Sequence, residues 1–324
     1  MSGAELLNIG VVACARYTHT PVIWGPLMHP EGQEERSRVR TRATRMRITH
    51  AWDIDAEAAH EFAQPYGARV VDHFADMVGA VDGVILDDFD SCSYFPVLAA
   101  PFLDAGIPLF INRPFALSMD DAHRLIDRAQ THDTPVMSAS SFEFAPEVDA
   151  IRQRVAGLGN LHGYAAANSM SDYATHGIHG LYFVHACVGG GIRSVAYQTP
   201  DWHEPNGVVS IEHEGRDGGR PFYGTVQQIS GTWGWIRVFG STSFEQWVGS
   251  GPYFWLPLLL EWQRMLETRQ MPQPYSVLLE KTGLFLAGFR SHLERQGAPV
   301  GLDELDGWIA PRLNPDPYPP GFSG

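Results

Sequence analysis

Two histidines near the middle of the chain have the residue type and spacing needed for proton transfer. His176 and His179 stand three residues apart beside glycines, so a helix over this segment places both on one face. Histidine suits general acid or base catalysis because its free pKa lies near neutrality. The neighbouring Tyr173 and His185 are candidate substrate-binding groups. Packing in a core is the alternative role for all four side chains.

Carboxylates gather where apolar runs end. Asp53 closes the run Met46 to Trp52, and a carboxylate at a strand end can accept hydrogen bonds from the ribose hydroxyls of a dinucleotide and disfavour a 2′-phosphate. Asp87, Asp88 and Asp90 follow another such run. Together with the histidines they are potential metal ligands, but the histidine spacing is not that of zinc proteases and no glutamate lies between the two rings. We therefore expect no catalytic metal.

The composition narrows the choice of partners. The 23 basic and 37 acidic side chains give a formal net charge of −14, which repels nucleic-acid phosphates and anionic lipid headgroups. Cys14, Cys92 and Cys187 are widely spaced and odd in number, which favours a reducing compartment. No apolar run approaches the roughly 20 residues of a membrane helix, and no signal peptide is recognisable. We expect a cytoplasmic protein that binds a small molecule, with no nucleic-acid or membrane partner.

Residues 1–139 predict a doubly wound parallel sheet, a Rossmann-type dinucleotide-binding domain, because short apolar runs alternate with helix-like segments. Helices are predicted over Ala56 to Ala63, with Asp55 as N-cap, and over Met119 to Ala129, with Ser118 as N-cap. The predicted strands are Leu7 to Ala13, Met46 to Trp52, Arg69 to Val71, Gly83 to Leu86, Pro108 to Ile111 and Pro135 to Ser138.

Residues 140–324 predict an α+β domain with a large, mainly antiparallel sheet. The predicted strands are Leu161 to Asn168, Ile192 to Thr199, Gly207 to His213, Thr225 to Ser230, Trp233 to Phe239 and Ser243 to Val248. The predicted helices are Pro146 to Ala156, Gly177 to Val188, Tyr253 to Thr268 and Pro274 to Arg295. One face of this sheet needs a cover, which favours a homo-oligomer, and the tail Pro315 to Pro320 is suited to cross a neighbouring subunit.

A long connection, His19 to Arg45, separates the first two predicted strands. Six arginines crowd the twelve residues Arg36 to Arg47. Such a cluster favours an anionic ligand or the acidic surface of another subunit. A solvated surface loop is the alternative.

The ordered motifs of both halves resemble the Gfo/Idh/MocA family of oxidoreductases over nearly the whole chain. The motifs are Asn8 to Ala13, His50 to Asp55, Val84 to Asp88, Ala105 to Pro114, His176-Gly-Ile-His179-Gly and Gly301 to Glu304. The resemblance implies NAD(P)-dependent oxidation or reduction of a sugar, cyclitol or related polyol, with His179 as the acid or base beside the reacting hydroxyl. It assigns substrate binding and oligomerisation to residues 140–324, and the cofactor contacts to Ala13, Ala15, Arg16, Thr18, Asp53, Asp88 and Asn112.

Two departures from the family pattern bear on function. The motif G-x-G-x-x-G becomes Ala13-Cys-Ala15-Arg16-Tyr-Thr18, and a Cβ at these places crowds the phosphates that glycines accommodate. Arg16 is then either a phosphate partner or a surface side chain. The family's Glu-Lys-Pro becomes Asn112-Arg113-Pro114. Arginine is a poor base, but its planar fork can clamp a carboxylate or stabilise an alkoxide, so we expect Arg113 to orient the substrate.

The resulting expectation is an oxidoreductase that uses NAD in preference to NADP, with Asp53 on the ribose and with Arg113, His179 and His176 as catalytic groups. Two alternatives stay open. One is a lyase or epimerase on the same scaffold, and the other is a binding protein that has lost the cofactor. The missing glycines and the missing lysine favour the second alternative.

Overall fold

Six strands of the N-terminal half form a parallel sheet in the order β3-β2-β1-β4-β5-β6. They are β1 (Leu7–Val12), β2 (Met46–Trp52), β3 (Arg69–Val70), β4 (Gly83–Leu86), β5 (Leu109–Ile111) and β6 (Val136–Met137). The computed structural model describes residues 5–14, 18–31, 43–169, 171–215, 218–249, 252–312, 317–319 and 322. Each predicted strand of this half is confirmed. For any one strand, the predicted and observed ends together differ by at most two residues, because strand ends are set by local turns.

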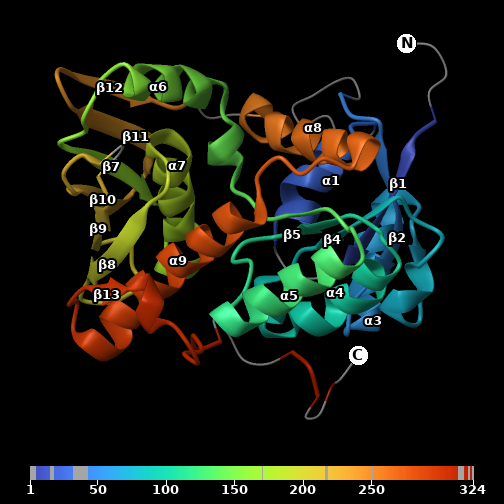
Figure 1. Ribbon diagram of the computed structural model, residues 1–324. Helices are drawn as coiled ribbons and strands as arrows, with labels where there is room; N and C mark the ends of the chain where they lie inside the picture. Colours follow the sequence, from blue (N-terminus) through green and yellow to red (C-terminus); the bar gives the residue numbers. More distant parts are fainter. Residues whose placement is uncertain are drawn as a thin grey trace.

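Helices cover both faces of this sheet because neighbouring residues of a strand point to opposite sides. On one side, Val84 and Leu86 pack with α4 (Phe95–Asp104) and α5 (Met119–Thr131). On the other side, Ile85 packs with α1 (Gly25–Met28), α3 (Ala56–Ala63) and α8 (Pro252–Thr268). The helix α8 belongs to the C-terminal half of the sequence but lies on the N-terminal sheet, beside α1 (Figure 1).

The two predicted N-caps are confirmed. The Asp55 carboxylate accepts a hydrogen bond from the backbone N–H of Ala58 at 3.1 Å, and the Ser118 hydroxyl accepts one from the backbone N–H of Asp121 at 3.1 Å. These contacts satisfy N–H groups that have no partner inside the helix. They fix where α3 and α5 begin. The loops that follow β2 and β5 at the carboxyl edge of the sheet therefore end at these caps.

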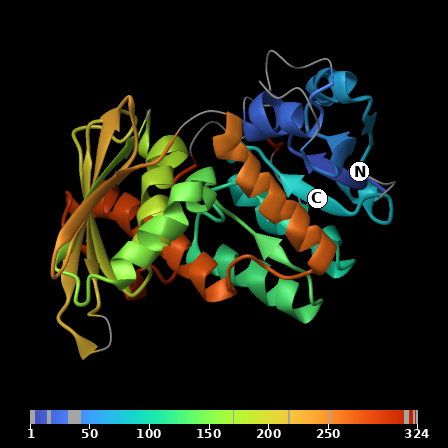
Figure 2. The same cartoon turned by 90° about the horizontal axis from the view of Figure 1, so that it is seen from above.

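The C-terminal half contains a seven-stranded mixed sheet in the order β12-β11-β7-β10-β9-β8-β13. Its strands are β7 (Gly163–Ser169), β8 (Ile192–Gln198), β9 (Val208–His213), β10 (Phe222–Ser230), β11 (Thr232–Phe239), β12 (Ser243–Trp247) and β13 (Val300–Gly301). All pairs are antiparallel except β7 with β10, which agrees with the predicted mainly antiparallel sheet. Helices α6 (Pro146–Ala156), α7 (Ile178–Val188) and α9 (Tyr275–Arg295) lie on one side of it (Figure 2).

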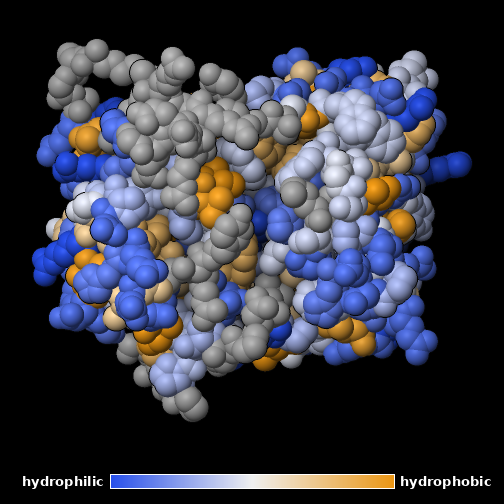
Figure 3. All heavy atoms as spheres, turned by 180° about the vertical axis from the view of Figure 1, so that it is seen from behind, coloured by the Kyte–Doolittle hydropathy of each residue, from blue (hydrophilic) through white to orange (hydrophobic). Residues whose placement is uncertain are grey.

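The surface seen from behind is mostly hydrophilic, and its apolar residues lie in small, separate groups (Figure 3). Cys14, Cys92 and Cys187 are buried and form no disulfide. Among the helices that the structure describes, none has the length and apolarity needed to cross a bilayer.

Candidate functional site

At the carboxyl edge of the parallel sheet, two polar side chains and one backbone N–H group meet around Asp87. This buried carboxylate accepts hydrogen bonds from the hydroxyl of Thr18, from the backbone N–H of Thr20 at 2.9 Å and from Asn112 Nδ2 at 3.0 Å. Burial raises the pKa of Asp87 to about 6, although the bonds from Thr18 and Thr20 oppose the rise. Because Nδ2 of Asn112 faces Asp87, its amide oxygen faces the opposite way, toward Arg113.

Arg113 follows Asn112 and lies at the junction of the two halves, with 2% of the residue exposed. Its guanidinium donates to Asn112 Oδ1 at 2.9 Å and to the Thr175 carbonyl at 2.9 Å. It also contacts His179 Nε2 at 2.8 Å and His19 Nδ1 at 3.0 Å. Chiefly because of burial, the pKa of Arg113 falls to about 9.

Among the described residues, no carboxylate contacts the guanidinium of Arg113. A buried cation without an ion-pair partner is costly to a protein and is usually paired or neutralised. An electron-rich oxygen placed next to Arg113 is therefore stabilised strongly, which is the property needed at a developing alkoxide.

His179 has a partner on each ring nitrogen. Arginine can only donate, so His179 Nε2 accepts from Arg113 and the ring proton sits on Nδ1, which donates to Ser140 Oγ at 2.6 Å. Burial, and then the charge of Arg113, lowers the pKa of His179 well below its usual range. His179 is thus a neutral ring that holds Arg113 in place.

A cavity of about 430 Å³ opens at this junction. It is lined by Thr18, His19, Val22, Ile23, Phe89, Arg113, Thr175, His176, His179, Trp233 and Trp255. The lining residues come from the long connection after β1, from the loops after β4 and β5, from the start of α7, from β11 and from α8. Both halves of the chain therefore build the cavity, and the three predicted catalytic residues meet in it.

His19 is a cavity residue that the sequence analysis did not single out. Its ring lies between Trp24, at 4.8 Å between centroids, and Trp255, at 5.7 Å. Burial and the charge of Arg113 lower the pKa of His19. No motif surrounds His19 in the sequence, because its place depends on the path of the long connection between β1 and β2.

Asp53 and Asp88 lie at the neighbouring part of the carboxyl edge. Asp53 ends β2, is largely buried and accepts a hydrogen bond from the backbone N–H of Asp55 at 3.0 Å. Asp88 caps the short helix Phe89–Tyr94 and accepts from the Ser91 hydroxyl at 3.1 Å. Burial raises the pKa of Asp88 to about 7, so this carboxyl is partly protonated at neutral pH and repels a nearby phosphate less.

The turn after β1 keeps the backbone shape for which glycine is usually needed. Ala13 has φ 57°, in the left-handed region, and its N–H donates to the Trp52 carbonyl at 2.9 Å. This turn and the Asp53 carboxylate fit the pyrophosphate and ribose edge of a dinucleotide. Ala15 and Arg16, the other predicted contacts here, lie outside the described residues, as do the arginines between 36 and 42.

Tyr318 of the C-terminal tail lies at the same edge. Its hydroxyl is 2.8 Å from Ser91 Oγ, and its ring is 4.2 Å from that of Tyr94 and 4.6 Å from that of Phe322, between centroids. The sequence analysis expected the tail to cross a neighbouring subunit. In its described residues the tail instead packs on the N-terminal half of its own chain, because aromatic rings are available there.

Two predicted substrate-binding residues are not at the cavity. Tyr173 is buried in the core, where its hydroxyl donates to the Phe285 carbonyl at 2.9 Å. His185 lies at the other end of α7, with Nε2 2.8 Å from Glu280 Oε2. In the described part of the chain, no group of three or more His, Cys, Asp or Glu side chains has a metal-binding arrangement.

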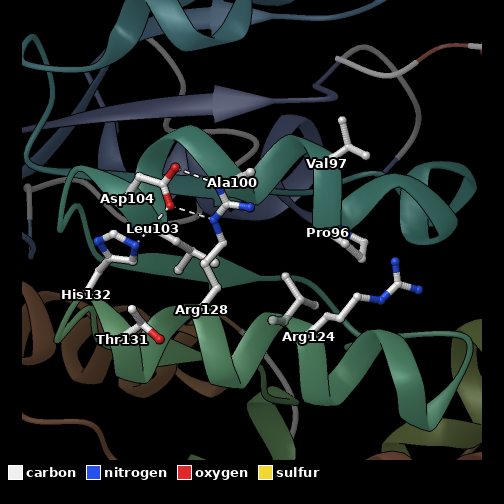
Figure 4. A pocket seen from close by; sticks show the side chains of 10 residues that line it. Pro96, Val97, Ala100, Leu103, Asp104, Arg124, Arg128, Thr131 and His132 are labelled. Carbon is white, nitrogen blue, oxygen red and sulfur yellow. Dashed lines mark hydrogen bonds and ion pairs between the residues drawn. The ribbon is translucent and has the colours of Figure 1, made fainter.

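A larger groove of about 730 Å³ lies between α4 and α5 (Figure 4). Its charged side chains are paired at the surface: Arg128 pairs with Asp104 inside the groove, and Arg124 pairs with Asp121 beside it. The groove lies on helices rather than at the carboxyl edge of the sheet, where ligands of such folds bind. We therefore place the functional site in the junction cavity.

Comparisons with known proteins relate the chain to a family and to solved structures. The family model described as "Oxidoreductase family, NAD-binding Rossmann fold" (Gfo/Idh/MocA) matches residues 9–140. Inositol 2-dehydrogenase 3 of Saccharopolyspora erythraea is 32% identical over 98 residues, which are 30% of this chain and 28% of that protein. The match thus spans little more than a quarter of the relative's length.

Solved structures resemble the chain over most of its length. The GenD2 protein of gentamicin A biosynthesis, in complex with NAD, superposes with a TM-score of 0.70 at 18% identity, over 92% of this chain and 97% of that one. Myo-inositol dehydrogenase of Lactobacillus casei, in complex with NAD(H) and myo-inositol, superposes with a TM-score of 0.71 at 14% identity, over 92% and 97%. At these identities the likeness establishes the shared fold.

Proposed function

Because residues 9–140 belong to the Gfo/Idh/MocA family of NAD-binding oxidoreductases, we propose that this chain is an NAD-dependent oxidoreductase acting on a hydroxyl or carbonyl group of a sugar, cyclitol or related polyhydroxylated molecule. The observation that carries the proposal is the buried guanidinium of Arg113. No carboxylate of the described residues contacts it, and it lies beside three histidines in the junction cavity. The resemblance to inositol dehydrogenases supports the substrate class.

NAD, when bound, takes up the hydride that leaves the carbon of an oxidised alcohol. Asp53 would hold the adenosine ribose, and the turn at Ala13 would face the pyrophosphate side. Arg113, oriented by Asn112 and His179, stabilises the negative charge that develops on the substrate oxygen. Trp233 and Trp255 add apolar walls that exclude water from the cavity.

Native mass spectrometry, paired with a turnover assay on a panel of polyols that includes myo-inositol, separates this function from its alternatives. Bound NAD(H) with net production of NADH supports the oxidoreductase. Bound NAD(H) with product formed but no net NADH supports a lyase or epimerase. A chain that retains no nucleotide at saturating NAD contradicts the proposal and favours a binding protein.

We expect NAD to bind at least about tenfold more tightly than NADP, because Asp53 faces the position of the extra phosphate and like charges in contact cost several kcal/mol. In Asp53→Ala the difference should shrink to a few-fold. Titrating both cofactors while following tryptophan fluorescence measures it. Asp55→Ala is the matched control, because Asp55 caps α3 and should affect stability without changing the preference. Unchanged discrimination in Asp53→Ala removes Asp53 from the cofactor site.

We also propose that the chain forms a homo-oligomer through the outer face of the seven-stranded sheet, which none of the described helices covers (Figure 2). Tyr223 and Phe239 both pair with Gly163 of β7, so their side chains lie on the same face of the sheet. Trp247 lies on this face as well, because it pairs with Trp235, four residues before Phe239 in β11. Tyr223 is 62% and Trp247 56% exposed. Large apolar side chains gathered on one sheet face indicate a contact surface.

Sedimentation velocity at micromolar concentration should show a mass above the 35.9 kDa of one chain. The double variant Tyr223→Glu/Trp247→Glu should sediment as a monomer, since two buried charges oppose association. Ile309→Glu, at an exposed apolar residue elsewhere, should leave the oligomer intact. A wild-type monomer rules the proposal out.

We place the protein in the cytoplasm. The support is that Cys14, Cys92 and Cys187 are all unpaired, which is typical of a reducing compartment.

A further inference from the structure

His176 differs from the other histidines of the cavity in the partners of its Nδ1 atom. This nitrogen lies 2.6 Å from Ser171 Oγ and 2.9 Å from Thr175 Oγ1. Both hydroxyls donate to Asp172 Oδ2, the serine at 2.9 Å. A hydroxyl carries one proton, so an oxygen that donates to Asp172 can only accept from the ring. The ring proton of neutral His176 is therefore held on Nδ1, and Nε2 keeps its lone pair.

Asp172 supplies negative charge behind this ring. Its Oδ1 accepts from the backbone N–H of Thr175 at 2.7 Å, and its Oδ2 lies 3.9 Å from His176 Nδ1. Burial alone would raise the pKa of Asp172, but the nearby ring of His176 and the hydrogen bonds from Thr175 and Ser171 outweigh it and hold the pKa below its usual range. The ionised carboxylate stabilises the imidazolium that forms once His176 takes up a proton.

The other two histidines of the cavity lack this support. His179 has both nitrogens occupied, and the charge of Arg113 opposes protonation of His19 and His179. The groups that face His176 are the Asp172 carboxylate, the ring of His179 at 6.2 Å, His19, and Arg113 through the Thr175 carbonyl. Among the described residues, a carboxylate lies within 4 Å of the ring of His176 and of neither other ring, and the His176 side chain is 37% exposed at the cavity.

We propose that His176 is the proton acceptor of the cavity and that Asp172 is its positioning residue, acting through the hydroxyls of Ser171 and Thr175. The inference rests on the proposed function. When an alcohol is oxidised, its C–H hydrogen leaves with both electrons as a hydride to NAD, and its hydroxyl proton leaves to His176 Nε2, so that a carbonyl remains. Reduction returns the proton from the same nitrogen. His179, which the family resemblance assigns to this role, holds Arg113 instead.

The test is NMR of the full chain labelled with [15N]histidine, with the signals of His176 assigned by His176→Gln. Nitrogen shifts distinguish a protonated Nδ1 from a bare one. We expect neutral His176 to carry its proton on Nδ1 in the wild type, and we expect a mixture of the Nδ1 and Nε2 tautomers in Asp172→Asn, because the two hydroxyls then no longer have to donate away from the ring. Asparagine keeps the cap on Thr175, so the fold should persist. Thr175→Val with Ser171→Ala removes the hydroxyls and should mix the tautomers in the same way, while Thr175→Ser should keep the proton on Nδ1.

Asp201→Asn is the matched control, because Asp201 contacts His203 at 2.7 Å outside the cavity. It should leave the tautomer of His176 unchanged. A proton found on Nε2 of neutral His176 in the wild type, or a tautomer unchanged in both the Asp172 and the hydroxyl variants, overturns the inference. NADH binding to the same samples tests the proposed function separately: a wild type that binds no NADH removes the function, and the tautomer still reports on the relay.

Discussion

Replacing Arg113 by alanine is expected to lower turnover by roughly 10²- to 10³-fold, the loss typical when a group that stabilises a developing oxyanion is removed. The reason is that Arg113 brings the only buried positive charge found among the described lining residues of the cavity. Arg113→Lys should recover little. A lysine ammonium cannot reach Asn112, Thr175, His19 and His179 at once, as the planar fork does.

NADH absorbance during turnover of whichever polyol of the panel is oxidised measures this effect. Arg269→Ala is the matched control, because Arg269 also donates to two backbone carbonyls, of Gly106 and Asp133, but lies outside the cavity. Circular dichroism should show that Arg113→Ala remains folded, and titration with NAD followed by tryptophan fluorescence should show an affinity close to that of the wild type. If Arg113→Ala and Arg113→Lys both stay within a few-fold of wild-type turnover, the chemistry does not take place at Arg113.

Replacing Lys281 by methionine is expected to lower the free energy of unfolding by about 3–5 kcal/mol, the cost of leaving a buried charge without its partner. Lys281 is the only lysine of the chain. Its Nζ lies 2.7 Å from Glu143 Oε2 and donates to Gln273 Oε1 at 2.8 Å and to the Ser138 carbonyl at 3.0 Å. Both charged side chains are almost fully buried, so water cannot replace the lost ammonium.

Urea unfolding of the single variant and of Lys281→Met/Glu143→Gln measures the pair. The double variant should recover part of the loss, because a neutral amide costs less to bury than a lone carboxylate. A single variant within about 1 kcal/mol of the wild type would show that Glu143 is protonated or hydrated instead of ion-paired. Glu143 also accepts from the Ser140 N–H at 2.7 Å, and Ser140 contacts His179, so the single variant should disturb the cavity as well.

The fold could be predicted because its signals are local. Alternating apolar residues, Asp55 and Ser118 as N-caps, and glycine turns each act within a few residues, and the bounds of β2, α3 and β4 agree with the prediction. The meeting of Arg113 and His179 could also be anticipated, since one follows a strand at the carboxyl edge and the other opens α7.

The rest of the site depends on contacts that are distant in sequence or on exact helix geometry. His185 lies six residues after His179, so at about 100° and 1.5 Å per residue it points roughly 120° away and sits about 9 Å further along α7. Tyr173 and His176 lie in a wider π-turn, Tyr173–Gly177, where a spacing of three residues does not place side chains on one face. The role of Asp172 depends on two hydroxyl orientations, and that of His19 on the path of a long connection.

A crystal structure of the chain with NADH tests the central claim most directly, which is that the junction cavity is the active site of an NAD-dependent oxidoreductase. We predict that the ribose hydroxyls of the adenosine contact Asp53 and that the nicotinamide ring enters the cavity beside Arg113 and His176. A dinucleotide bound elsewhere, or a cavity that stays empty at saturating NADH, would contradict the claim.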